Sequence, residues 1–207
     1  MFCYTFHIMQ SGQRAFIFIG RSGCGKGTQA ALLIEALKAR DHARDVLYVE
    51  TGKEFRAFMS GDGYTQQLTK SISGEGGLSP EFLAIYLWVN AIVREYTEGN
   101  HMVLDGMPRK LEEAVIVDSM LDMYGFEGAD VCYINVSREW AKMRLLDRKR
   151  ADDTEEKIDR RLDWFENDVW PAIKYFKDNP KYRVHDIHGE RPKEDVHADL
   201  LSRIELP

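Results

Sequence analysis

Short apolar runs recur along the chain and are separated by longer amphipathic stretches. The first four runs consist almost entirely of β-branched, aromatic and other apolar residues, which is typical of strands covered on both faces. We therefore predict strands at residues 15–19, 46–49, 102–104, 131–134 and 182–187.

The stretches between these runs carry apolar residues at spacings of three and four, which predicts helices that bury one face. The longest stretch contains Pro171, which is expected to kink the helix or to mark a boundary within it. Helices are predicted at residues 26–40, 53–60, 80–98, 110–123, 137–148, 154–178 and 192–205.

This alternation of strands and helices predicts an α/β fold with a mostly parallel, five-stranded sheet and helices on both faces. Ligands of such sheets bind beyond the carboxyl ends of the strands. Residues 51–80 depart from the pattern, because they contain six glycines and two short helical stretches without a convincing strand. We interpret them as an insertion that can move relative to the core.

A glycine-rich segment, Gly20-Arg-Ser-Gly-Cys-Gly-Lys-Gly-Thr28, connects the first predicted strand to the first predicted helix. Glycines let a backbone wrap a polyphosphate without Cβ clashes, and its N–H groups can then point at the anion. The helix N-terminus adds a favourable dipole, and Lys26 supplies a positive charge for the β- and γ-phosphates. The segment therefore predicts a nucleotide-phosphate site. Gly27 stands where Ser or Thr normally meets magnesium, which points to a narrower family.

The composition fits one domain of a soluble enzyme. The chain has 207 residues, 44% hydrophobic and 30% charged, with a net charge of −6. That is enough for a proper core, and the negative balance argues against a surface for nucleic acid. No apolar run reaches 18 residues, so no membrane span is expected. Cys3, Cys24 and Cys132 show no metal-ligand spacing, which favours a reducing, cytoplasmic compartment. Residues 1–14 lack the pattern of a secretion signal and are interpreted as an N-terminal extension.

Six further motifs follow the glycine-rich segment in order. Together the seven resemble the adenylate kinases and related nucleoside monophosphate kinases, over residues 16–206. Each motif alone is weak evidence, but seven in register are specific. The further six are Thr51-Gly-x-x-x-Arg56, Asp105-Gly-Met-Pro-Arg109, Arg144-x-x-x-Arg148, Arg150-x-Asp-Asp153, Arg161-Leu162 and Gly189-x-Arg-Pro192.

The resemblance implies a P-loop NTPase fold and reversible phosphoryl transfer from Mg²⁺-ATP to a nucleoside monophosphate. Because such a transfer is mainly a matter of positioning and charge, cations are expected around the transferring group. The resemblance assigns this role to Lys26, Arg109, Arg144, Arg148, Arg150 and Arg161.

The spacing of these arginines supports part of that assignment. Arg144 and Arg148 are four residues apart and share one helix face, whereas Arg150 reaches the same site only if the helix breaks near Lys149. A solvated basic helix end is the alternative for this stretch.

By resemblance, the acceptor nucleotide binds at Thr51, Gly52, Arg56, Gly76, Gly77, Leu78, Gly106, Arg109, Glu113, Arg150 and Arg161. The donor ATP binds at Gly23, Cys24, Gly25, Lys26, Gly27, Thr28, Arg144, Arg148 and Arg191, with the turn at 189–192 reading the base through its backbone. Asp105 is expected to orient Mg²⁺ through water, with a helix cap or turn residue as the alternative.

Glu113 departs from the family pattern, which usually has Gln at this position, where its amide pairs with adenine. A carboxylate only accepts hydrogen bonds, so it mismatches adenine unless it is protonated or turned away, and it suits the two adjacent donors of guanine. The sequence thus favours AMP as acceptor through its other motifs and GMP or dGMP through Glu113.

A very short lid, at about 147–153, is the second departure, because the family places a loop or small domain between the arginines matching Arg148 and Arg150. Such a lid excludes water poorly. It contains no cysteine, so zinc is not expected. The remaining domain expectation is a P-loop kinase core over 15–207, acting as a monomer.

Cys24 and the four tryptophans are interpreted as packing residues without a role in catalysis. Cys24 lies near Lys26 and a helix N-terminus, surroundings that tend to lower a thiol pKa, but we interpret it as a small residue that fits the loop. Trp88, Trp140, Trp164 and Trp170 are interpreted as core or interhelical packing.

Three alternatives to an adenylate kinase stay open. The chain could be a UMP/CMP kinase, a P-loop kinase for another small metabolite, or a nucleotide-binding regulatory protein without catalysis. The motifs at 51–56 and 105–109 weigh against the metabolite kinase, and the presence of Lys26, Asp105 and Arg109 weighs against the regulatory protein.

Overall fold

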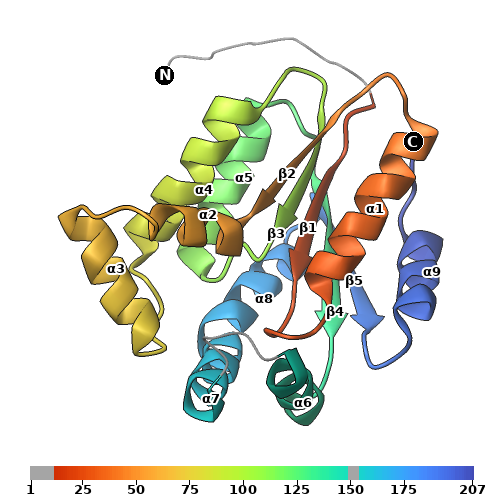
Figure 1. Ribbon diagram of the computed structural model, residues 1–207. Coiled ribbons are helices and arrows are strands. Elements are labelled where there is room, and N and C mark those ends of the chain that lie inside the picture. The colour runs from red at the N-terminus through yellow and green to blue at the C-terminus, as the bar shows by residue number, and fades with distance from the viewer. Residues whose placement is uncertain (1–11, 149–153) are drawn as a thin grey trace.

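The fold is built on one parallel sheet whose strands lie in the order β2-β3-β1-β4-β5 (Figure 1). The computed structural model describes residues 12–148 and 154–207. The predicted strands are confirmed, with ends that shift by at most two residues. They are β1 (Ala15–Ile19), β2 (Val46–Glu50), β3 (His101–Asp105), β4 (Ala129–Asn135) and β5 (Tyr182–His188).

The predicted helices are also confirmed within the described ranges, with boundaries that differ by up to three residues, except that the longest is divided. They are α1 (Lys26–Arg40), α2 (Thr51–Phe58), α3 (Tyr64–Gly74), α4 (Glu81–Glu95), α5 (Leu111–Met123), α6 (Arg138–Arg148), α7 (Glu155–Trp164), α8 (Trp170–Asp178) and α9 (Lys193–Arg203).

The interruption expected in the longest helix lies one turn before Pro171. Residues Phe165–Val169 form a π-helical turn between α7 and α8, in which the backbone N–H of Trp170 donates to the carbonyl oxygen of Phe165. A proline removes a backbone donor and crowds the preceding turn, so the regular hydrogen-bond pattern is disturbed there. The helix therefore continues from the site-facing α7 to the core helix α8 through this π-helical turn.

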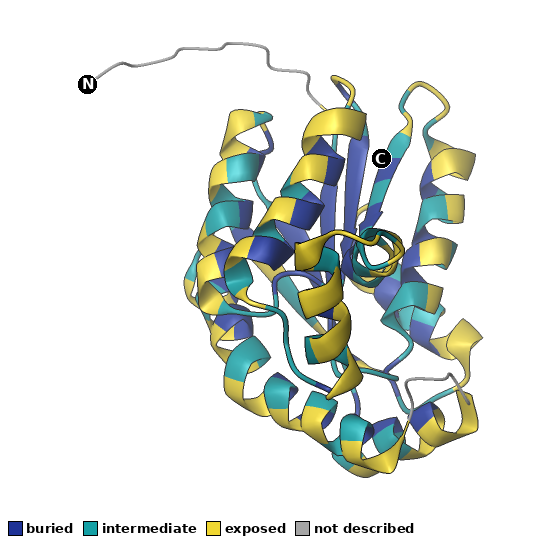
Figure 2. Cartoon of the chain, turned by 60° about the vertical axis from the view of Figure 1, so that its left-hand side comes forward, coloured by how far each residue is buried: buried dark blue, intermediate teal, exposed yellow. Residues whose placement is uncertain are grey.

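The central strand β1 is buried on both faces, and its alternating side chains enter two different cores. Ala15, Ile17 and Ile19 pack with residues of α4, α5 and α8, including the fully buried Trp88. Phe16 and Phe18 pack with residues of α1, α6, α7 and α9. Figure 2 shows the dark blue strands enclosed between helices that turn their exposed faces outward. This two-sided burial fixes the carboxyl end of β1.

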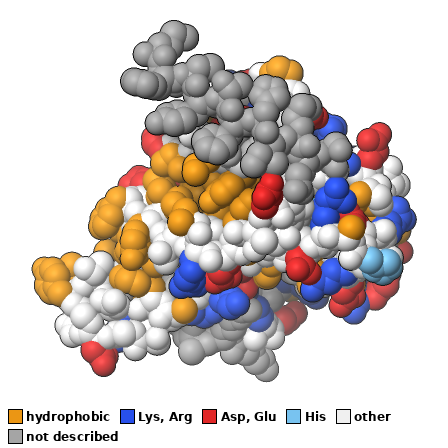
Figure 3. All heavy atoms as spheres, turned by 90° about the horizontal axis from the view of Figure 1, so that it is seen from above, with side chains coloured by type: hydrophobic (Ala, Val, Ile, Leu, Met, Phe, Trp, Pro, Cys, Tyr) orange, Lys and Arg blue, Asp and Glu red, His pale blue; other side chains and the backbone are white. Residues whose placement is uncertain are grey.

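Helices α2 and α3 and their connections fill residues 51–80, the predicted insertion. Thr69 is the only buried residue of α3. Tyr64 and Leu68, which lie on the same helix, have exposed apolar side chains. Seen from above, hydrophobic side chains gather on the side of α3 and α4 (Figure 3). α3 thus has few contacts that fix it to the core.

No helix in residues 12–148 or 154–207 is both long and apolar enough to cross a bilayer.

A buried carboxylate ties β4 to its neighbours at the end of the sheet opposite the carboxyl ends. Asp130 accepts hydrogen bonds from Arg14 at 2.8 Å, Arg183 at 2.9 and 3.0 Å and His185 at 2.8 Å. Burial by itself raises the pKa of Asp130, but these partners outweigh burial and hold the pKa below its ordinary value. The ionised carboxylate therefore stabilises the fold at neutral pH.

We expect the Asp130→Asn substitution to lower the free energy of unfolding by about 2 kcal/mol at pH 7, because it removes the charge of a buried carboxylate that accepts hydrogen bonds from Arg14, Arg183 and His185. A carboxylate with a lowered pKa stabilises the fold above its ordinary pKa of about 3.9, so the difference from wild type should shrink as the pH falls below about 4. Urea unfolding at pH 7 and pH 3.5 measures both effects. The exposed Asp178→Asn is the control, and equal unfolding midpoints of the two variants at pH 7 would contradict the prediction.

Candidate active site

A cavity of about 1250 Å³ lies beyond the carboxyl ends of β1, β2 and β3. The last residue of each of these strands lines it: Ile19, Glu50 and Asp105. The remaining walls come from the glycine-rich loop, α2, the segment after α3, and helices α6 and α7. The cavity is therefore at the edge of the sheet where the sequence predicted a ligand.

The glycine-rich loop forms the floor of the cavity on the α1 side, and Gly23, Gly25, Lys26, Gly27 and Thr28 all line it. Gly23 has a φ of +83°, and a Cβ there would lie 2.9 Å from the carbonyl oxygen of Ala141. Glycine is therefore required where the loop packs against α6. Lys26 begins α1, and its Nζ donates to the carbonyl oxygens of Gly20 and Arg21, each at 3.4 Å. The backbone of the loop thus curves around the ammonium group of Lys26.

Cys24 is placed behind the loop, at 3% exposure, and does not line the cavity. Burial raises the pKa of its thiol, although the charge of Lys26 opposes this. The expectation that these surroundings lower the thiol pKa is therefore wrong, because loss of solvent outweighs the nearby cation. Cys24 serves the loop as a small packed residue.

Asp105 is the last residue of β3, and the next helix begins only at Leu111. Its Oδ2 accepts a hydrogen bond from the Tyr48 hydroxyl at 2.9 Å, while its Oδ1 is buried with no hydrogen-bond partner among the described residues. Burial raises the pKa of Asp105, opposed by Lys26 and Tyr48. A Cβ on Gly27 would lie 3.2 Å from Oδ2. The carboxyl therefore faces the loop at close range with one oxygen unused.

Five of the six predicted cationic groups share the cavity. Arg109 follows the Gly106-Met-Pro turn, and its Nε donates to the carbonyl oxygen of Gly106 at 3.0 Å. The guanidinium of Arg144 lies 5.2 Å from the ring centre of Trp140. Arg150 lies outside the described residues. The five that line the cavity are Lys26, Arg109, Arg144, Arg148 and Arg161.

The acceptor residues predicted from the resemblance are divided between the cavity wall and the layer behind it. Thr51 and Glu113 are buried and do not line the cavity. Glu113 Oε2 has no hydrogen-bond partner among the described residues, and burial raises the pKa of this carboxyl, opposed by the charge of Arg109. Those that line the cavity are Gly52, Arg56, Gly76, Gly77, Leu78, Gly106, Arg109 and Arg161.

Arg191, predicted for the donor, does not line the cavity either. Its side chain donates to Asp199 at 2.5 Å and to the carbonyl oxygen of His188 at 3.0 Å, so it is held on α9.

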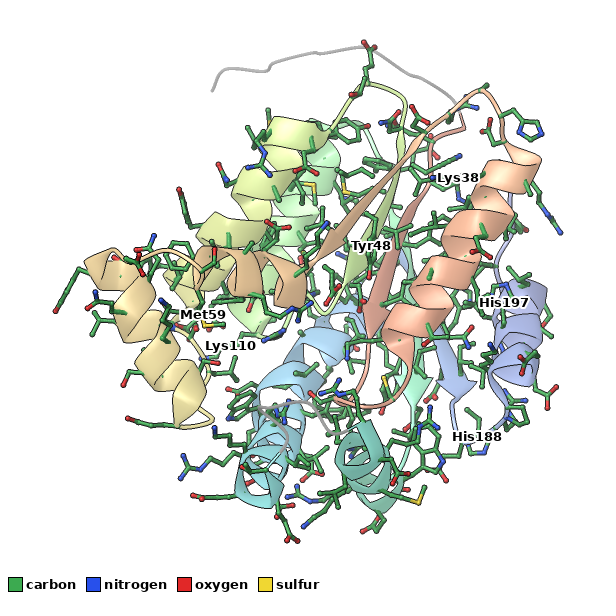
Figure 4. All side chains as sticks on the ribbon, viewed as in Figure 1. Lys38, Tyr48, Met59, Lys110, His188 and His197 are labelled. Atoms are coloured by element: carbon green, nitrogen blue, oxygen red, sulfur yellow. The ribbon has the colours of Figure 1, made fainter. Side chains whose placement is uncertain are left out.

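The cavity also contains residues that the sequence analysis did not select. Trp164 lines it, Trp88 is fully buried as expected, and Trp170 is 46% exposed. Tyr48, Glu50, Phe55, Met59 and Lys157 are among the others. Figure 4 labels Tyr48, which lies on β2, and Met59, which directly follows α2. Two signals would have found some of these: Glu50 directly follows a predicted strand, and Phe55 and Met59 are four residues apart.

Comparisons with known proteins agree with this geometry. A model of the family described as adenylate kinase matches residues 18–181. Adenylate kinase 1 of Nostoc sp. is 33% identical over 188 residues, which cover 91% of this chain and 97% of the relative. The adenylate kinase of Corynebacterium diphtheriae is 31% identical, with the same coverage. That of Leuconostoc mesenteroides is 30% identical over 89% of this chain and 93% of its own.

The burial of both described cysteines predicts inert thiols. The thiolate is the reactive form, and burial raises the pKa of both Cys24 and Cys132. In a Cys3→Ser variant, an aromatic disulfide reagent at pH 8 should label no thiol in the native protein and two in guanidinium chloride. Rapid labelling of one native thiol, with loss of nucleotide binding, would contradict this and support redox inactivation through Cys24.

Proposed function

The chain belongs to the adenylate kinase family, and we propose that it catalyses reversible phosphoryl transfer from ATP to AMP, which yields two ADP. As a member of this family it is a nucleoside monophosphate kinase, a phosphotransferase. The observation that carries the specific proposal is the convergence of Lys26 and four arginines on one cavity. Two polyanions approach one another only where such a set of fixed cations screens their charges.

In this proposal the cavity holds donor and acceptor side by side. The loop amides, Lys26 and the α6 arginines bind the donor phosphates, and Arg56 binds the acceptor phosphate. Arg109 and Arg161 lie against the transferring group, where positive charge stabilises the transition state more than the ground state. Arg150 is proposed to join them. The insertion at 51–80 closes over the acceptor and excludes water.

The residues of the cavity fit Mg²⁺. Asp105 Oδ1 is a buried carboxyl oxygen without a partner in the described chain, beside a loop that is proposed to carry the phosphates. No three His, Cys, Asp or Glu side chains gather to hold a metal in the described ranges, and Mg²⁺ is commonly held by substrate phosphates, water and one or two carboxylates. Asp105 would hold the ion through its water shell, and bound Mg²⁺ neutralises charge on the phosphates.

Glu113 supports a second candidate acceptor, a guanine monophosphate. Its Oε2 is buried behind the cavity wall and has no hydrogen-bond partner among the described residues. A base that donates two hydrogen bonds would satisfy it once the wall moves to admit the base. The raised pKa of Glu113 also matters, because a protonated carboxyl both donates and accepts, as an amide does. We therefore propose that AMP pairs with the neutral form of Glu113 and GMP with the ionised form.

A coupled assay of ADP formation from ATP and AMP tests the proposed function. We expect Lys26→Met to lower kcat by at least about 100-fold, because it removes a charge aimed at the transferring phosphates. Lys38→Met, at the far end of the same helix α1 and labelled in Figure 4, should leave the rate unchanged. No ADP formation by the wild type would contradict the proposal and favour the regulatory protein.

The acceptor preference should depend on pH. Deprotonation of Glu113 converts a donor–acceptor group into an acceptor alone, and burial raises the pKa of this carboxyl above its ordinary value. The ratio of kcat/KM for GMP to that for AMP should therefore rise with pH. Glu113→Gln should lower this ratio about tenfold at pH 8.5 and remove its pH dependence, since a mismatched buried pair costs about 1–3 kcal/mol. The neighbouring, exposed Glu112→Gln is the control. No measurable GMP turnover at any pH would eliminate guanine as an acceptor.

A further inference from the structure

Arg56, the proposed ligand of the acceptor phosphate, faces an acidic partner in this structure. Its Nη2 donates to Glu50 Oε1 at 2.9 Å. The Arg56 side chain is 55% exposed and that of Glu50 31%, and both residues line the cavity. A carboxylate and a phosphate present similar oxygen acceptors to a guanidinium, so Glu50 occupies the position at Arg56 that an anionic ligand would take.

The ion pair lies over Gly52. Glu50 ends β2 and directly precedes α2, and Arg56 lies one and a half turns into that helix. A Cβ on Gly52 would lie 3.0 Å from Arg56 Nη1 and 3.1 Å from Glu50 Oε1, so both charged groups approach the backbone closely at this residue. The pair therefore lies at the start of the insertion, against the backbone that connects β2 to α2.

Among the described residues that line the cavity, Glu50 and Asp105 carry carboxylates, and the other charged residues are lysines and arginines. Glu50 lies beside Asp105 in the register of β2 and β3, and its charge contributes to raising the pKa of Asp105. A phosphate that approached Arg56 with Glu50 still in place would meet this negative charge at close range. The phosphate and Glu50 therefore compete for the same guanidinium.

We propose that Glu50 is an internal competitor of the acceptor phosphate: it pairs with Arg56 and is displaced from that guanidinium when the acceptor binds. The inference deepens the proposed function, because it rests on the assignment of Arg56 to the acceptor. A nucleoside monophosphate carries between one and two negative charges at pH 7, so it displaces the single charge of Glu50. Glu50 thereby weakens acceptor binding and keeps the acceptor site selective for the more highly charged ligand.

The test is Glu50→Gln, which preserves the shape of the side chain and removes its charge. AMP binding, measured by calorimetry without a donor, should tighten about two- to fivefold, the range expected for release of a partly exposed ion pair. In steady-state assays the ratio of acceptor KM to donor KM should fall by the same factor. Glu54→Gln is the matched control, because it removes one acid from α2, the helix that carries Arg56, at a position whose charge acts on Arg94.

A second variant separates competition from simple charge repulsion. In an Arg56→Gln background there is no guanidinium to release, so adding Glu50→Gln should leave AMP binding unchanged. If the twofold or larger gain persists in that background, long-range repulsion explains it and the inference is wrong. Weaker AMP binding by Glu50→Gln alone would also overturn it, because it would show that Glu50 positions Arg56 for the ligand.

Failure of this inference can be told apart from failure of the proposed function. Binding is measured without turnover, so a chain that binds AMP more tightly as Glu50→Gln but forms no ADP would sustain the inference and contradict the kinase. If the wild type forms ADP but Glu50→Gln leaves AMP binding unchanged, the kinase proposal would be sustained and the inference contradicted.

Discussion

Repulsion among the cations of the cavity is the constraint on which the rest of the site depends. Two lysines and five guanidinium groups of the described residues line it, from a loop, a turn and three helices, and their like charges oppose one another. Several of them have partners nearby. Lys26 donates to the carbonyl oxygens of its own loop, Arg56 pairs with Glu50, and Arg144 lies over an indole ring. Bound nucleotides would replace these weak partners with strong ones, so substrate binding and organisation of the site are coupled.

The frame that brings these groups together is the central strand. Because β1 is buried on both faces, its carboxyl end has a fixed position, and the loop that follows it begins from a rigid base. β3 lies directly beside β1 and ends at Asp105, which places a carboxyl opposite the loop. The neighbouring β2 ends at Glu50 in the same row. Parallel pairing thus delivers the acidic groups to one edge, whereas the basic groups come from the segments that surround it.

Three carboxylates lie in or directly behind the wall of this cavity: Asp105, Glu50 and Glu113. Asp105 accepts a hydrogen bond from Tyr48, and Glu50 pairs with Arg56. Glu113 is buried behind the cavity wall, and its Oε2 has no hydrogen-bond partner among the described residues. Each of them lies near guanidinium groups, so their charges influence binding in different ways according to burial and protonation. Burial raises the pKa of Glu113, whereas Glu50 remains partly open to solvent. The same type of side chain can therefore act on the base of a nucleotide in one place and on its phosphate in another.

The sequence by itself determined the strands, the helices, the parallel sheet and the phosphate loop, because these follow from local hydrophobic period and from glycine chemistry. It also singled out six cations, of which five line one cavity. Only the tertiary structure decided what lies between them. The pairing of Arg56 with Glu50, the burial of Cys24, the exposure of Trp164 to the cavity and the fixing of Arg191 on α9 all depend on side-chain directions and solvent exclusion. Neither is encoded in residue type or spacing, because both arise only when segments far apart in the chain pack against one another.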